Sequence, residues 1–167
     1  MEISGMAQEE TTTVTHERPR TRKVIEALLK ERQDMLVLLW ELSKKDLKNV
    51  DQAIVDVLDD FIEILVDYIA AGHFSLYRRI AEGKERREPV LKTAQEIYPR
   101  IAETTEVAIE FSERYEAADR GRLASHLAND LSTLGEEVTT RIELEDKLIM
   151  AMLGSDYDLP DHAAAAS

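Results

Sequence analysis

Apolar residues recur every three or four positions in four long stretches of the chain, which is the spacing of an amphipathic helix. The stretches cover about residues 20–43, 50–81, 90–116 and 119–154. In the first of them the inward positions are Ile25, Leu28, Met35, Leu39 and Leu42. No alternation typical of β-strands occurs over a useful length. The pattern therefore predicts an all-α fold, an antiparallel up-down four-helix bundle with short links.

Polar segments outside this pattern set the expected boundaries of the bundle. Residues 1–18 are rich in Thr and Glu and predict a flexible acidic N-terminal tail. Residues 19–154 form the predicted bundle, and residues 155–167, which end in a run of alanines, predict a flexible C-terminal tail. The chain is thus expected to hold one domain between two tails.

Helix-terminating and helix-breaking residues refine the expected elements. Asn49 and Gln52 have the spacing of a capping box that would open the second helix. Gly72 lies inside that helix, where it costs about 1 kcal/mol relative to alanine, and it predicts close packing or a local irregularity. Pro99 predicts a kink or a restart in the third helix.

Composition excludes several classes of protein. The 167 residues suit one domain, and the absence of cysteine excludes disulfides, thiolate metal sites and cysteine nucleophiles. A formal charge of −13 disfavours binding to nucleic acid or to an anionic membrane surface. Residues 1–14 lack the apolar core of a signal peptide, and no run of about 18 apolar residues occurs. We therefore expect a cytoplasmic protein without a membrane span.

Charged residues occupy apolar positions in two of the predicted helices. Arg32 falls in the inward row of the first helix, and Arg141 and Glu145 fall in that of the fourth. In an antiparallel pairing, Arg32 and Glu145 lie at a similar depth, which predicts a buried ion pair, with Asp67 and His73 of the second helix as candidates to share it. The alternative is that the two arginines extend to solvent at the edge of the bundle.

Acidic residues form a stripe of one sign on the second helix. No Lys or Arg occurs in residues 49–77, and the spacings of four, three and four place four acids on one face. These acids are Asp56, Asp60, Glu63 and Asp67. A stripe of one sign favours a docking surface for a basic partner. A plain solvent-exposed acidic face, or an interaction protein with a different basic partner, fits the stripe as well.

The histidines do not match known catalytic or metal-binding patterns of helical bundles. A di-iron bundle requires Glu-x-x-His motifs, and no histidine has a glutamate three residues before it. His126 lies in a segment similar to phosphotransfer modules, but Asn129 and Asp130 replace the expected Lys and Gly. We therefore expect no enzyme activity, cofactor or metal. The alternative is a phosphotransfer or metal-binding signalling protein that uses His73 or His126.

Three segments resemble the Rsd/AlgQ family of bacterial regulators that bind the housekeeping sigma factor. The most specific is residues 66–77, with the sequence VDYIAAGHFSLY. Arg141 together with residues 144–149 is a second match, and residues 28–36 give a weaker third one. The three segments occur in the family's order and span most of the predicted bundle.

The resemblance implies a four-helix bundle that sequesters the primary sigma factor by binding its C-terminal helix-turn-helix domain. With the acidic stripe, it gives the residues expected to bind the partner: Asp56, Asp60, Glu63, Asp67, His73 and Tyr77. The residues expected in a buried polar network that shapes the docking pocket are Arg32, Asp67, His73, Arg141, Glu145 and Asp146. Family members are also linked to stringent-response enzymes and sugar phosphotransfer carriers, so the resemblance allows a second partner.

Overall fold

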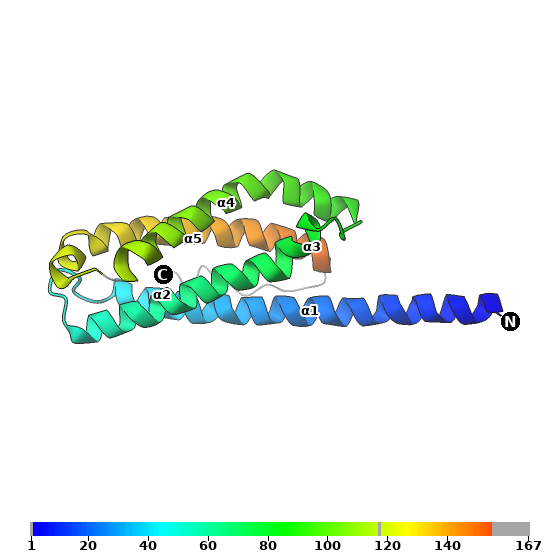
Figure 1. The fold of residues 1–167 in the computed structure, drawn as a ribbon, viewed down its shortest axis with the longest axis horizontal. Coiled ribbons are helices and arrows are strands. Elements are labelled where there is room, and N and C mark those ends of the chain that lie inside the picture. Colours follow the sequence, from blue (N-terminus) through cyan, green and yellow to red (C-terminus); the bar gives the residue numbers. More distant parts are fainter. Residues whose placement is uncertain (1, 117, 155–167) are drawn as a thin grey trace.

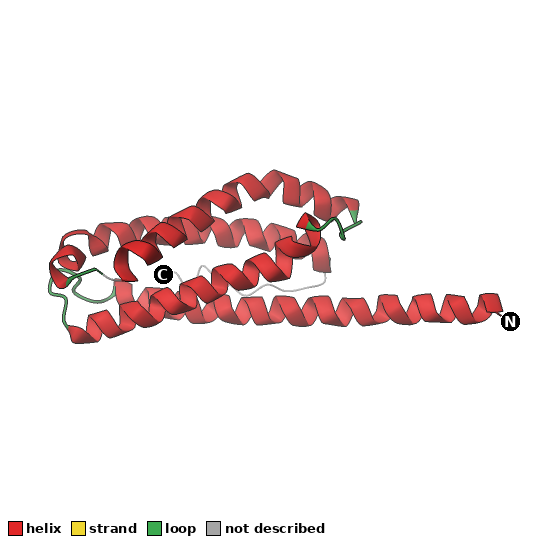
Figure 2. Cartoon of the chain, in the orientation of Figure 1, coloured by secondary structure: helices red, strands yellow, loops and turns green. Residues whose placement is uncertain are grey.

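The chain folds into long helices that pack side by side (Figure 1). The computed structural model describes residues 2–116 and 118–154, with side chains described from residue 21 onward. Within these ranges it contains only helices and loops and no strand (Figure 2). The elements in chain order are α1 (Glu2–Ser43), α2 (Gln52–Gly72), the π-helical turn η1 (His73–Tyr77), α3 (Arg78–Ala81), α4 (Glu88–Glu116) and α5 (Arg120–Leu153). The all-α prediction is confirmed.

The helices are arranged as an up-down bundle. Helix α1 packs mainly against α2, α4 packs mainly against α5, and contacts of α2 with α4 and of α1 with α5 close the bundle. In Figure 1 the N-terminal part of α1 extends past the ends of the other helices. None of the described helices is both long enough and apolar enough to cross a lipid bilayer.

Helix α1 begins earlier than its hydrophobic pattern suggests. The pattern predicts a start near residue 20, whereas the structure has helix from Glu2 onward. The flexibility of residues 1–18 stays a prediction. The predicted tail at residues 155–167 lies outside the described residues.

The core runs the length of the bundle and follows the predicted apolar positions. Four of the five inward positions predicted for α1 are fully buried, and Leu39 is half-buried. From α2 and α4, Phe61 and Phe111 meet edge to face with ring centroids 6.0 Å apart. Fully buried side chains from the four long helices include Ile25, Leu28, Met35, Leu42, Leu58, Leu65, Val90, Leu127, Leu134 and Leu148.

The cap of α2 differs from the predicted one. Asp51 is the N-cap, and its carboxylate accepts a hydrogen bond from the backbone N–H of Ile54 at 2.9 Å. The side chain of Asn49 instead donates to Asp46 in the preceding turn at 2.7 Å. The predicted capping box is therefore wrong, and the N-cap lies two residues later than predicted. Asp51 immediately precedes the first turn of the helix and reaches its free N–H groups.

The other residues that bend, begin or end helices act largely as expected. Helix α4 continues through Pro99 without a restart, and its ribbon bends in Figure 1. Helix α5 begins after Asp119, which accepts from the backbone N–H of Arg122 at 2.9 Å. It ends at Leu153, and the next residue, Gly154, caps it with a φ of 85°, which favours glycine.

A buried carboxylate fixes the link between α3 and α4. Glu85 is 5% exposed and accepts hydrogen bonds from the side chain of Arg87 at 2.9 and 3.0 Å. Arg87 also donates to the carbonyl of Met152 in α5 at 2.8 Å. The bonds from Arg87 lower the pKa of Glu85 to about 2. Arg87, held in place by the ionised carboxylate of Glu85, therefore ties this link to the end of α5.

Glu85→Gln should lower the free energy of unfolding at pH 7 by about 1–2 kcal/mol. Because the pKa of Glu85 is depressed in the folded state, ionisation stabilises the fold above the ordinary pKa near 4.5, and the contribution is lost as pH falls toward 2. Urea unfolding of wild type and variant at pH 7 and at pH 2.5 measures the difference. A difference that does not shrink at pH 2.5 would contradict this assignment.

Candidate functional site

The four acids predicted to form a stripe lie on the exposed side of α2. Helix α2 is regular throughout, so the spacings of four, three and four place them along one line. We call Asp56, Asp60, Glu63 and Asp67 the acidic ridge. All four are exposed, and none forms an ion pair within the described part of the chain. The ridge therefore presents uncompensated negative charge to solvent.

A shallow groove between α1 and α2 borders one side of the acidic ridge. Its lining includes Asp60 and Glu63 of the ridge and Asp34 of α1. Val37 on the same groove is 44% exposed. A partner that contacts the ridge thus meets apolar surface and a further acid on the α1 side.

A deeper and more apolar groove lies between α2, η1 and α4. We call it the apolar groove; its volume is about 540 Å³. Four large apolar side chains in its lining are strongly exposed: Val66 (48%), Phe74 (62%), Tyr98 (54%) and Ile109 (45%). Arg141 of α5 also belongs to the lining. The groove combines apolar walls with one buried cation.

The π-helical turn η1 decides which side chains at the end of the VDYIAAGHFSLY segment face the core and which face solvent. A π-turn holds an extra residue, so it changes which side chains face the core. His73 and Phe74 are exposed, whereas Leu76 and Tyr77 are buried. Tyr77 was expected to contact a partner, but it is only 4% exposed and lies beneath the accessible surface. Its ring packs edge to face on Tyr98 with centroids 6.0 Å apart.

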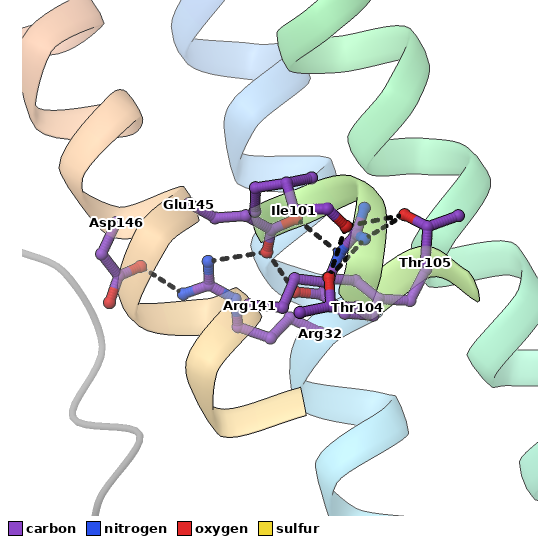
Figure 3. A network of polar contacts seen from close by, with 8 residues as sticks. Arg32, Ile101, Thr104, Thr105, Arg141, Glu145 and Asp146 are labelled. Atoms are coloured by element: carbon purple, nitrogen blue, oxygen red, sulfur yellow. Dashed lines mark hydrogen bonds and ion pairs between the residues drawn. The ribbon is translucent and has the colours of Figure 1, made fainter. Parts of the chain in front are cut away.

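A polar network crosses the core where α1, α4 and α5 meet (Figure 3). Arg32 donates to Glu145 at 3.3 Å and to Asp146 at 2.6 Å. Arg141 donates to the other oxygen of Glu145 at 3.2 Å. Arg32, Arg141 and Glu145 are each at most 2% exposed. The predicted Arg32–Glu145 pair is therefore present, and the alternative of arginines extending to solvent is wrong.

Three hydroxyl groups complete the network, and sequence reasoning did not assign them to it. Tyr68 of α2 donates to Glu145, and complete burial together with that carboxylate raises the pKa of Tyr68 well above its ordinary value. Thr104 and Thr105 of α4 accept from Arg141 at 3.2 and 2.7 Å. A tyrosine at an inward position of a helix indicates a polar partner nearby, because its buried hydroxyl needs a hydrogen bond. The threonines carry no comparable signal.

Asp67 and His73 do not belong to this network. Both side chains are exposed, and neither takes part in its hydrogen bonds. The prediction that they share the buried pair is wrong, because Tyr68, one position after Asp67, is the residue that faces the core. Asp67 instead ends the acidic ridge.

Gly72 lies against the network. A Cβ at this position would be 3.0 Å from Oε2 of Glu145 and 3.2 Å from Nη2 of Arg141. The predicted close packing and local irregularity both occur, since η1 begins at the next residue. The absence of a side chain at Gly72 lets α2 approach the buried charges.

The two histidines whose side chains the structure describes stand apart from any cluster that could bind a metal. His73 and His126 are exposed. Among the described residues, no group of three or more His, Asp or Glu side chains could hold a metal ion. Asp130, four residues after His126, accepts from Arg114 at 3.0 Å and also from Tyr115. The described geometry offers no observation that favours the phosphotransfer or metal-binding alternative.

Comparisons with known proteins agree with the resemblance seen in the sequence. Proteins called "Regulator of sigma D" from Salmonella arizonae, Salmonella newport and Salmonella typhi are each 31% identical to the chain over 144 residues. The aligned part covers 83% of this chain and 86% of each relative. No solved structure matches. Residues 7–153 match the family described as "Regulator of RNA polymerase sigma(70) subunit, Rsd/AlgQ". The chain therefore belongs to the Rsd/AlgQ family.

Proposed function

We propose that this protein regulates transcription by binding the primary sigma factor of RNA polymerase. In this proposal it holds the C-terminal helix-turn-helix domain of sigma away from the polymerase core and from promoter DNA. Family membership supports the choice of sigma as the partner. The protein then acts as a cytoplasmic binding protein and catalyses no reaction.

The acidic ridge is the observation that carries the choice of domain. A helix-turn-helix domain contacts DNA phosphates through basic side chains, which an exposed row of carboxylates attracts. The ridge acids have no basic neighbour on α2, so their charge is available to a partner. Occlusion of the DNA-binding surface follows from such a contact, because the ridge and the phosphates would compete for the same basic residues.

Co-purification with the subunits of the cell's own polymerase tests the proposal directly. The tagged protein should capture sigma without the core subunits. The isolated C-terminal domain of sigma should bind as well as full-length sigma. Capture of core enzyme together with sigma would contradict sequestration, and binding to sigma that lacks this domain would contradict the choice of domain.

Neutralising the acidic ridge should slow association with the sigma domain about tenfold at low salt. The expected cause is loss of electrostatic steering, so the difference should shrink as ionic strength rises. Stopped-flow or surface-based binding kinetics at two salt concentrations measure it. The variant combines Asp56→Asn, Asp60→Asn, Glu63→Gln and Asp67→Asn.

A matched control separates a specific site from net charge. It carries the same number of neutralised acids on exposed positions of α4 and α5. The control variant combines Glu96→Gln, Glu110→Gln, Glu113→Gln and Glu143→Gln. Equal slowing in both variants would mean that only net charge matters, and an unchanged rate in the ridge variant would exclude the ridge as the docking surface.

A further inference from the structure

One end of the bundle is basic, although the chain as a whole is strongly acidic. Residues 78–92 cover α3, the link to α4 and the start of α4, and they contain six Lys or Arg and three Glu. The formal charge of the whole chain is −13. All six basic residues of this range are exposed, and we call them the basic end: Arg78, Arg79, Lys84, Arg86, Arg87 and Lys92.

The acids within this range do not neutralise the basic end. Glu82 is shared between Arg78 and Lys84, with a distance of 2.9 Å to each. Arg86 and Lys92 form no ion pair within the described part of the chain. Like charges on one surface repel one another, so a further acidic group placed among them is stabilised.

The part of the chain that follows α5 has the opposite charge. Residues 155–161 contain three aspartates and no Lys or Arg. We call this stretch the acidic segment; its aspartates are Asp156, Asp158 and Asp161. Its charge therefore complements that of the basic end.

The chain enters the acidic segment beside the basic end. Arg87 donates to the carbonyl of Met152 at 2.8 Å, and α5 ends at the next residue. Figure 1 shows α3, the start of α4 and the end of α5 at the same end of the bundle. Because an extended chain spans about 3.3–3.6 Å per residue, the three aspartates can reach the basic end without any change in the bundle.

From this arrangement we propose that the acidic segment binds the basic end of the same molecule through its three aspartates. Surface ion pairs are individually weak. The segment is joined directly to the bundle, however, which gives it a high effective concentration at the basic end. Bound there, it closes the basic end to acidic segments of other proteins. This inference does not rest on the proposed binding of sigma, which uses the acidic ridge.

A peptide with the sequence of residues 155–162, added to the full chain, measures how far the basic end is already occupied. The segment variant of the full chain combines Asp156→Asn, Asp158→Asn and Asp161→Asn. At low salt this variant should bind the peptide about fivefold more tightly than the wild type, which corresponds to a basic end that is occupied about four-fifths of the time. Amide NMR shifts of residues 78–92 report the titration, and high salt should remove the difference.

Two further variants separate a specific contact from net charge. Glu106→Gln, Glu110→Gln and Glu113→Gln together neutralise three exposed acids in the later part of α4, and they should change the affinity for the peptide less than about twofold. Adding Lys84→Gln and Arg86→Gln to the segment variant removes two exposed charges of the basic end. The peptide should then bind about fivefold more weakly than to the segment variant alone.

Carbodiimide cross-linking tests the contact within the wild-type chain. The reagent joins a carboxylate to a lysine amine that lies against it, and mass spectrometry identifies the two residues. The aspartates of the acidic segment should be joined to Lys84 or Lys92. Lys147 is exposed on α5 and lies closer along the chain, so random motion of a tethered segment would favour Lys147 instead.

Four outcomes would overturn the inference. These are equal affinity of the peptide for the wild type and the segment variant, no binding of the peptide to the segment variant, an equal gain in the α4 variant, and cross-links mainly to Lys147. Loss of sigma binding in the ridge variant bears only on the proposed function and leaves this inference standing.

Discussion

Glu145→Gln is expected to lower the free energy of unfolding by about 3–5 kcal/mol. Glu145 is fully buried and is the only carboxylate that both Arg32 and Arg141 contact in the described structure. The amide keeps the shape of the side chain but removes the charge, and its NH₂ group would face a guanidinium. Urea unfolding followed by circular dichroism at pH 7 measures the loss.

Glu143→Gln is the matched control for this substitution. It makes the same chemical change two residues earlier on α5, where the side chain is exposed. Its effect should stay within about 0.5 kcal/mol. A loss below about 1 kcal/mol for Glu145→Gln would contradict the assignment of Glu145 as the shared counter-ion.

Replacing the whole network by apolar side chains should lower the free energy of unfolding far less than Glu145→Gln alone. The combined replacement is Arg32→Met, Tyr68→Phe, Arg141→Met and Glu145→Leu. Apolar side chains of similar volume avoid the desolvation of the buried charges, and such exchanges are often neutral or stabilising. The network is thus better understood as setting the relative positions of α1, α2, α4 and α5 than as a source of net stability.

Hydrophobic spacing together with the helix-breaking and helix-terminating residues predicted the class of fold and most helix boundaries, apart from the start of α1. Long helices with uniform periodicity leave little ambiguity, because each apolar stripe must face the others. Arg32, Arg141 and Glu145 fall in the inward rows of their helices, and this position predicted a buried ion pair. Charged side chains in an apolar row are costly to bury unless they pair with one another.

Local geometry is where sequence reasoning failed. The π-turn after Gly72 shifts the side chains that follow it, so the burial of Tyr77 could not be obtained from helical spacing. Asp67 and His73 were assigned to the core by association with neighbouring residues, whereas Tyr68 between them makes the contact. The cap at Asp51 depends on the path of the preceding turn, which the capping-box pattern does not describe.

Gly72→Ala is expected to lower the free energy of unfolding by about 2 kcal/mol. An alanine in a regular helix normally gains about 1 kcal/mol over glycine. Here the added Cβ would lie 3.0 Å from Glu145 and 3.2 Å from Arg141, so it must displace two side chains that are held by buried ionic bonds. Such overpacking costs about 1–3 kcal/mol, and weakening the ion pair adds to it.

Gly135→Ala provides the opposite expectation within the same protein. Gly135 lies inside α5, and a Cβ there would meet nothing within 4 Å. This substitution should therefore raise stability by about 1 kcal/mol through helix propensity and a less flexible unfolded chain. Thermal and urea unfolding of the two variants should give shifts of opposite sign. If both substitutions stabilise the protein, the side chains of Glu145 and Arg141 can move aside at no cost in free energy. Close packing would then not explain why residue 72 is a glycine.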